Sequence, residues 1–306
     1  MKTILVTGGT GLVGKVLVEK LVKLDYKVIV LSRSKKKESE NISYALWNIN
    51  KGEIDIEAIK KVDAIIHLAG AGVMDKKWTD EYKKEIEHSR TKSSGLIIDA
   101  LKNNEHKVKT IVSASAIGWY GEDKGDGLFF KEDEKSAEGF LGNTCKLWEQ
   151  SVEAAAALNI RVCKLRIGIV LSKDGGAYKE FKTPLKFGIA AILGSGKQII
   201  SWIHIEDLCN QFIFALENDS MHGSYNAVTA MPVSNKVLTL QIANVTRGNF
   251  FIPIHVPTFM LKIILGDRSI EILKSTTVSN EKIVNAGYKY LYPSIEEAVK
   301  NIEQKN

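Results

Sequence analysis

The sequence has little arginine, cysteine or proline, and it has no long apolar run. Only six of its 42 basic residues are arginines, and the lysines are mixed with acidic residues. The net charge of +6 therefore does not predict a nucleic-acid partner. No stretch approaches the roughly 18 apolar residues that span a bilayer, so we expect no membrane span and no membrane partner.

Few cysteines and histidines are present, and neither type is clustered. The three cysteines (Cys145, Cys163 and Cys209) are far apart and form no CxxC pair, which predicts free thiols in a reducing compartment. The histidines show no metal-ligand spacing, so we expect no metal site. Only about five apolar residues precede Gly8, too few for a signal-peptide core, and we expect a cytoplasmic protein.

Short runs rich in valine and isoleucine alternate with helical patterns over the first two thirds of the chain. The clearest helical pattern places Val13, Leu17 and Leu21 on one face. This alternation predicts an α/β fold with a Rossmann-type, doubly wound parallel sheet, whose strands end along one ligand-binding edge. The expected strands are Thr3 to Thr7, Lys27 to Leu31, Ile42 to Leu46, Ala64 to Leu68, Thr110 to Ser113 and Val162 to Ile169.

The pattern changes after about Leu171, where glycines cluster, and four of the five prolines lie beyond residue 230. We expect a strand–helix unit that starts at Ile199 to return to the sheet. The predicted cofactor domain therefore comprises residues 1–170 plus about 199–230. Residues 171–198 and 231–306 are expected to form a smaller substrate-side lobe that caps it. The sequence predicts no oligomeric state.

A glycine-rich turn joins the first predicted strand to the first helix. Gly8 allows the sharp turn, Gly11 lets the backbone approach a pyrophosphate, and Gly14 lets helix and strand pack closely. The amide groups and positive dipole end of the helix then face the phosphates. We therefore predict dinucleotide binding by the turn residues Gly8, Thr10, Gly11, Leu12, Val13 and Gly14.

The end of the second predicted strand indicates which dinucleotide is bound. NAD-specific sites usually place a carboxylate there to hold the ribose 2′-hydroxyl, but this strand ends in Ser32 and Arg33. Arg33 is suited to a 2′-phosphate, with Ser32 or Ser34 as a further donor and Lys35 nearby. The predicted cofactor is NADP(H).

Together these motifs resemble the atypical short-chain dehydrogenase/reductases of the NAD(P)-dependent epimerase/dehydratase superfamily. The sequence is most similar to the nucleoside-diphosphate-sugar epimerase-like group, which has a small C-terminal domain. The resemblance covers nearly the whole chain. Its motifs are Gly8 to Gly14, His67 to Ala71, Trp78 to Arg90, Ser113 to Gly121, Phe140 to Glu149, Arg166 to Leu171, Gly194 to Gly196, Ser201 to Asp207 and Leu265 to Ala298.

The resemblance implies further cofactor contacts at the ends of the fourth and fifth predicted strands. Small residues after His67 would let the backbone of Leu68, Ala69 and Gly70 lie against the cofactor. Ser113 and Ser115 would lie beside the nicotinamide, where a hydroxyl could hydrogen-bond a substrate carbonyl during hydride transfer.

The resemblance also implies a tyrosine four residues before a lysine on one helix. In such relatives the lysine holds the ribose and lowers the pKa of the tyrosine, which acts as acid or base. Lys146 stands where that lysine is expected, but Gly142 stands in place of the tyrosine. Tyr120 is the first candidate for the missing acid or base, and weaker candidates are Glu122, Asp133 and Glu138.

Two functions remain open at this stage. The first is an NADP(H)-dependent oxidoreductase or epimerase acting on a small carbonyl or sugar-like substrate. The second is a non-catalytic NADP(H)-binding sensor or regulator, which the missing tyrosine favours. For the first function the Gly194–Gly196 segment would contact the substrate, with Trp202 and His204 beneath it, although His204 is more readily read as a structural hydrogen-bond partner.

Overall fold

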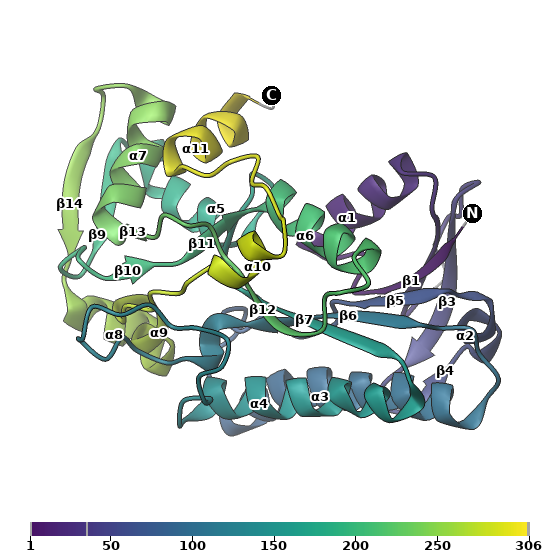
Figure 1. Cartoon of the computed structure of the whole chain (residues 1–306). Coiled ribbons are helices and arrows are strands. Elements are labelled where there is room, and N and C mark those ends of the chain that lie inside the picture. The colour runs from purple at the N-terminus through teal and green to yellow at the C-terminus, as the bar shows by residue number, and fades with distance from the viewer. Residues whose placement is uncertain (1, 35, 305–306) are drawn as a thin grey trace.

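The computed structural model describes residues 2–34 and 36–304. Within them, an eight-stranded sheet has the strand order β12-β7-β6-β5-β1-β2-β3-β4 (Figure 1). Its pairs are parallel, except that β4 runs antiparallel to β3. The strands are β1 (Thr3–Thr7), β2 (Lys27–Ser32), β3 (Ile42–Asn48), β4 (Glu53–Ile54), β5 (Ala64–His67), β6 (Thr110–Ala116), β7 (Arg161–Ile167) and β12 (Gly223–Ala227).

Helices cover both faces of this sheet. Helices α1 (Leu12–Lys23) and α6 (Ile205–Glu217) lie on one face, and α3 (Asp80–Asn103) and α4 (Phe140–Glu153) lie on the other (Figure 1). The short α2 (Ile56–Lys61) precedes β5. Because helices enclose the sheet, Ile4, Leu5 and Val6 are fully buried although they point alternately to its two faces. The predicted doubly wound α/β fold is confirmed.

The expected strand from Val162 to Ile169 is divided at Gly168. Its second part, β8 (Ile169–Leu171), leaves the main sheet and pairs with β11 (Trp202–His204). Glycine is needed at this point because a β-carbon on Gly168 would lie 2.6 Å from the carbonyl oxygen of Ser201. The unit that begins at Ile199 therefore does not itself enter the main sheet. The strand that extends the sheet is β12, which follows α6.

The remaining elements form a second lobe beside the sheet. Its core includes Tyr178, Trp202 and Leu238, all at most 1% exposed. Within the described residues, no helix is long and apolar enough to cross a membrane. The elements of the lobe are α5 (Gly176–Lys182), β9 (Ile189–Leu193), β10 (Ile199–Ile200), β13 (Val233–Ser234), α7 (Asn235–Arg247), β14 (Ile252–Val256), α8 (Thr258–Leu265), α9 (Ser269–Leu273) and α11 (Ile295–Gln304), with short 3-10 turns at Pro184–Phe187 and Gly266–Arg268. Helix α10 (Glu281–Asn285) is an exception, because it packs on β12 of the main sheet, and two further 3-10 turns, at Ile117–Trp119 and Ala154–Leu158, also belong to the sheet domain.

The buried carboxylate of Asp207 on α6 connects this lobe to the sheet domain. It accepts hydrogen bonds from the hydroxyl of Tyr288 at 2.8 Å and from the backbone amides of Leu291 at 2.8 Å and Tyr292 at 2.9 Å. Asp207 is 0% exposed. Three donors from one late segment of the chain therefore converge on a single side chain of the sheet domain.

We predict that Asp207→Ala lowers the free energy of unfolding by about 2–4 kcal/mol, because buried donors lose their acceptor. The matched control is Asp219→Ala, which removes a carboxylate that is 98% exposed. It should change stability by no more than about 0.5 kcal/mol. Urea unfolding curves of the three proteins measure both effects, and equal midpoints for the two variants would contradict the prediction.

Candidate functional site

The glycine turn between β1 and α1 is shaped by direct backbone contacts. Gly8 has φ +67°, and a β-carbon there would lie 2.9 Å from the carbonyl carbon of Leu68. A β-carbon on Gly14 would lie 2.2 Å from the carbonyl oxygen of Gly8. Any larger residue at either position would push apart the turn, the helix and the end of β5.

The start of α1 is open to a ligand. Thr10 and Gly11 are exposed, Leu12 and Val13 are half-buried, and among the described residues no side chain caps this helix end. The unpaired amides and the positive end of the helix dipole suit an anionic group. The residues of the turn thus fit the pyrophosphate of a dinucleotide.

A buried hydrogen-bond network holds the end of β5 against the turn. The hydroxyl of Thr7 accepts from the amides of Leu68 at 3.0 Å and Ala69 at 3.1 Å, and lies 2.7 Å from Nδ1 of His67. The Thr7 hydroxyl, which accepts those two bonds, can donate its own hydrogen bond to Nδ1 of His67. On the other side of the ring, the hydroxyls of Ser93 and Ser94 both donate to the Arg90 carbonyl.

Those two serine oxygens lie 3.2 Å from Nε2 of His67 and can accept its proton. The network therefore assigns His67 as the neutral tautomer protonated on Nε2. Burial, with the charge of Arg90 adding to it, lowers the pKa of His67 to about 4. This histidine is a structural link between β1, β5 and α3, and Gly70 beyond it is exposed.

The end of β2 lies on the opposite side of β1 from β5. Ser32 is buried there, while Arg33 and Ser34 are exposed, and the Ser34 amide approaches the Ser32 hydroxyl at 3.4 Å. Lys35, which was expected nearby, lies outside the described residues. Arg33 is therefore placed where a ligand at the carboxyl ends of the strands can reach it.

The two serines expected beside the nicotinamide are already engaged within the protein. Ser113 is 0% exposed and donates to the Ala114 carbonyl at 2.9 Å. Ser115 donates to Oε1 of Glu149 on α4 at 2.7 Å. Because its proton is used in that bond, Ser115 offers a ligand only acceptor lone pairs, which is the reverse of the expected hydrogen bond to a substrate carbonyl.

Glu149 is the centre of a buried ionic network that sequence reasoning did not assign. Its carboxylate accepts hydrogen bonds from Nε of Arg166 at 2.7 Å, from Nη2 of the same guanidinium at 3.0 Å and from the Ser224 hydroxyl at 2.8 Å. Burial alone would raise the pKa of Glu149, but the hydrogen bonds and charge of Arg166 outweigh it and lower that pKa. The sequence could have indicated this pair, because Glu149 shares the inner face of α4 with apolar residues and a buried glutamate there needs a cationic partner.

Tyr120 belongs to the same network. Its hydroxyl donates to Asn226 at 2.7 Å and accepts from Nη1 of Arg166 at 2.8 Å, and its ring stacks on Phe130. Burial raises the pKa of Tyr120 to about 12, against the opposing charge of Arg166. This arrangement argues against Tyr120 as the acid or base and indicates a packing role.

The helix α4 shows that counting back from Lys146 gives the wrong register for the tyrosine–lysine pair. Gly142 faces the preceding loop, and a β-carbon there would lie 2.0 Å from the Ala137 carbonyl oxygen, so no tyrosine fits. Lys146 is exposed. The residues facing Gly118, just beyond β6, are Leu141 and Cys145, 3.3 Å and 3.7 Å from a β-carbon built on that glycine. The inner face of α4 at this edge therefore carries an alkyl group and a thiol.

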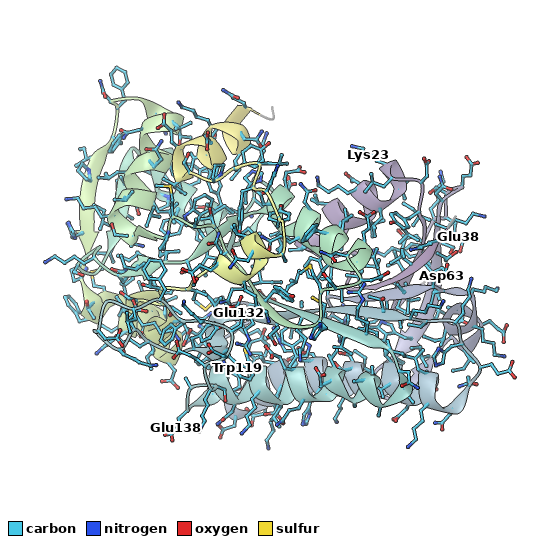
Figure 2. All side chains as sticks on the ribbon, viewed as in Figure 1. Lys23, Glu38, Asp63, Trp119, Glu132 and Glu138 are labelled. Atoms are coloured by element: carbon cyan, nitrogen blue, oxygen red, sulfur yellow. The ribbon has the colours of Figure 1, made fainter. Side chains whose placement is uncertain are left out.

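The weaker acid–base candidates remain at the surface. Glu122, Asp133 and Glu138 are exposed, and Glu138 lies just before α4 (Figure 2). Half-buried Glu132 instead accepts from the Asn226 amide at 2.8 Å, and burial raises its pKa. The Glu132 carbonyl also accepts from Nη1 of Arg166 at 3.1 Å, and the same guanidinium lies 3.8 Å from the ring of Trp119; both residues are labelled in Figure 2.

The Gly194–Gly196 segment forms a turn within the second lobe. Gly194 packs against Leu273 and Thr258, and Trp202 is fully buried in the core of that lobe. His204 caps α6 by accepting from the Glu206 amide at 3.1 Å. Trp202 and His204, which were expected beneath a substrate, are both buried, the first in the core of the lobe and the second at the start of α6.

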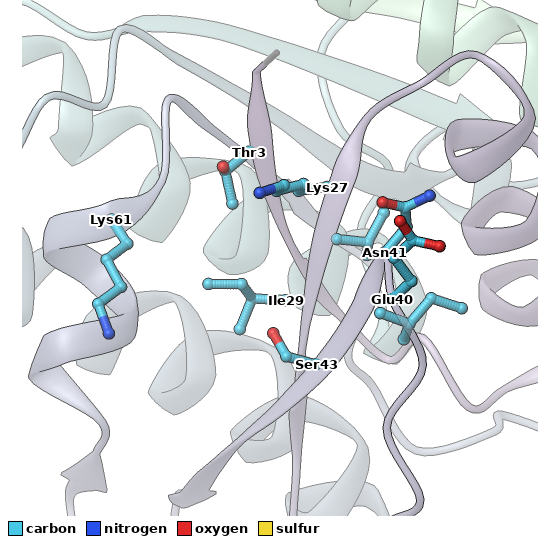
Figure 3. A pocket seen from close by; sticks show the side chains of 9 residues that line it. Thr3, Lys27, Ile29, Glu40, Asn41, Ser43 and Lys61 are labelled. Carbon is cyan, nitrogen blue, oxygen red and sulfur yellow. The ribbon is translucent and has the colours of Figure 1, made fainter.

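A shallow hollow of about 330 Å³ is found at the other edge of the sheet (Figure 3). It is lined by residues at the beginnings of β1, β2 and β3, including Thr3, Lys27 and Ile42. It therefore lies opposite the glycine turn and is separate from the candidate cofactor site. Among the described residues, no group of three His, Cys, Asp or Glu side chains could hold a metal.

The buried His67 predicts a pH-dependent stability. The unfolded chain takes up a proton near pH 6.5, whereas folded His67 does so only near pH 4. The free energy of unfolding therefore has its full value above pH 6.5. It falls by about 3 kcal/mol in total as the pH is lowered from 6.5 to 4, because only the unfolded chain binds the His67 proton in that range.

We predict that His67→Gln removes this part of the pH dependence. His222→Gln, at an exposed site, should keep it. Urea unfolding at several pH values between 6.5 and 4 measures the slope. An unchanged slope in the His67 variant would show that this histidine is not held neutral.

Comparison with known proteins identifies the family. A model described as the NAD dependent epimerase/dehydratase family matches residues 4–227, and one described as a domain of unknown function, DUF1731, matches residues 256–302. An epimerase family protein of Staphylococcus aureus (strain MRSA252) is 32% identical over 309 residues, covering 100% of both chains. Epimerase family protein YfhF of Bacillus subtilis is 31% identical over 300 residues, covering 98% of this chain and 97% of the relative.

Solved structures agree with this assignment. Human epimerase family protein SDR39U1, solved with NADPH, matches with a TM-score of 0.86 and 25% identity, covering 99% of this chain and 100% of that one. The UDP-glucose 4-epimerase of Thermotoga maritima, solved with UDP-glucose, has the same fold, with a TM-score of 0.80, 19% identity and 99% coverage of each chain. The resemblance inferred from the motifs is confirmed, and the chain belongs to the NAD-dependent epimerase/dehydratase family.

Proposed function

We propose that this protein binds NADP(H), with the 2′-phosphate of the adenosine ribose held at the end of β2. The observation that carries this proposal is the exposed Arg33 at a strand end where NAD-specific sites place a carboxylate. The neighbouring Ser32 and Ser34 supply hydroxyl or amide groups. The NADPH in the human relative's structure supports the same cofactor. The ligands we propose are small molecules, with no nucleic acid and no membrane among the partners.

We predict that Arg33→Asp weakens NADPH binding about 10- to 100-fold, because a charge-assisted hydrogen bond becomes a repulsion. NADH, which lacks the 2′-phosphate, should lose much less affinity. Lys27→Asp makes the same charge change at the opposite end of β2, where the side chain is also exposed, and should leave both affinities unchanged. Titration calorimetry gives the constants, and equal losses for NADPH and NADH would refute the assignment.

The reaction we propose is hydride transfer between NADP(H) and a small carbonyl or sugar-like substrate, as an oxidoreductase or epimerase. When bound, the cofactor supplies the hydride donor or acceptor. The described inner face of α4 offers Leu141 and Cys145 rather than a phenol and an amine, so in this proposal the proton is exchanged with solvent. The oxygen takes up a solvent proton when a carbonyl is reduced, and the hydroxyl releases its proton to solvent when an alcohol is oxidised. Ser115 would accept a hydrogen bond from a substrate hydroxyl.

A second candidate function is a non-catalytic sensor of NADP(H). It is favoured by the alkyl group and thiol of Leu141 and Cys145 on α4, where a phenol and an amine were expected, and by the engagement of the Ser115 and Tyr120 hydroxyls inside the protein. Under this alternative, the cofactor edge binds without transferring a proton or a hydride.

One experiment separates the two candidates. The NADPH-loaded protein is incubated with aldehydes, ketones and nucleotide sugars, while the absorbance of the reduced nicotinamide and the sugar configuration are followed. Oxidation of NADPH or an epimerised product supports the enzyme. Retained binding with no change over the whole panel supports the sensor, and absence of NADPH binding would refute both.

A further inference from the structure

Arg90 on α3 is a cation that no carboxylate of the described residues neutralises. Its Nη1 donates to the Ile86 carbonyl at 2.8 Å within the same helix, and its guanidinium lies 5.0 Å from the ring of Trp148 on α4. These contacts fix the plane of the group, but they leave most of its five donors without a recorded acceptor in the part of the chain that the structure describes. Burial lowers the pKa of Arg90, so the position is costly for a charge.

The guanidinium meets the exposed end of β5. A β-carbon built on Gly70 would lie 3.1 Å from its central carbon and 3.3 Å from Nη2. Gly70 therefore leaves the space that the guanidinium occupies at the carboxyl end of the sheet. Burial raises the pKa of the Cys145 thiol on α4 to about 12, and the positive charge of Arg90 acts against that rise.

The strand order indicates which part of a dinucleotide comes to this place. The pyrophosphate is expected at the turn after β1, and Arg33 at the end of β2 marks the adenosine side. The other half of the molecule must then lie across β1 from β2, over the ends of β5 and β6. Gly70 follows β5 and Gly118 follows β6, so Arg90 and Cys145 are found under that half.

We propose that Arg90 binds the ribose on the nicotinamide side of the cofactor, donating to its two neighbouring hydroxyls from the fork of the guanidinium. The charge expected from Lys146 on α4 is thus supplied from α3. This inference rests on the proposed binding of NADP(H). It extends the cofactor site to a side chain to which the Trp78 to Arg90 motif had given no role.

The test compares ligands that end at different points of the cofactor. NADPH contains the second ribose, whereas 2′-phosphoadenosine 5′-diphosphate contains the 2′-phosphate and both bridging phosphates but no second ribose. We predict that Arg90→Gln weakens NADPH binding about 10- to 100-fold and leaves the affinity for the shorter ligand within about twofold. Arg90→Lys keeps the charge but loses the fork, and should show an intermediate loss.

The matched control is Lys146→Gln, which removes an exposed cation from α4 and should leave both affinities unchanged. Equal weakening of both ligands by Arg90→Gln would overturn the proposal in favour of a phosphate contact or a general disturbance of the fold. A loss of NADPH affinity in the Lys146 variant alone would also overturn it. If Arg90→Gln does not fold, the Arg90→Lys comparison decides alone. Failure of the unaltered protein to bind either ligand would refute the proposed function itself.

Discussion

The hydroxyl of Thr7 is the contact on which the cofactor edge depends. It accepts hydrogen bonds from two backbone amides at the end of β5 and pairs with the buried ring of His67. It thus joins β1 and β5, the two parallel strands at which the order of the strands along the chain changes direction. The close approach of Gly8 to the Leu68 backbone is possible only because this junction is held in place. The shape of the glycine turn is thus determined by β5 as much as by its own glycines.

A second constraint is the buried pair of Glu149 and Arg166. Breaking such a pair leaves an uncompensated charge in the interior, so each partner requires the other. Because Glu149 also accepts the hydrogen bond of the Ser115 hydroxyl, and Arg166 donates to the Tyr120 hydroxyl, the pair fixes the orientation of both hydroxyls. The network therefore secures the ends of β6 and β7 and at the same time withdraws these hydroxyls from acid–base chemistry.

The sequence predicted the sheet well, because long valine- and isoleucine-rich strands and the glycine turn are local signals. The Thr3–Thr7 strand is found with the expected bounds, and β2 ends at Ser32, one residue beyond the expected end. Residue 168 was missed as a division point because its reason, the Ser201 carbonyl, lies far away in the sequence.

The candidate site was less predictable. The register of α4 could not be deduced from the spacing to Lys146, since it depends on how Gly142 packs against Ala137. Arg90 ends the Trp78 to Arg90 motif, but the motif gave it no role, and its significance follows from Gly70 and Trp148, which approach it only in the folded chain. Side chains whose role depends on distant partners are the ones that pattern alone did not find.

The carboxylate of Asp207 also has a consequence for the order in which a growing chain acquires its structure. All strands of the main sheet have been synthesised once β12 is complete. Two of the donors to Asp207, however, are the amides of Leu291 and Tyr292, which follow Asp207 by 84 and 85 residues. During synthesis α6 must therefore keep a solvated carboxylate at a surface that is later covered. The carboxylate loses its water only when the segment from Tyr288 to Tyr292 arrives, which makes the docking of that segment on α6 one of the last steps in building the domain.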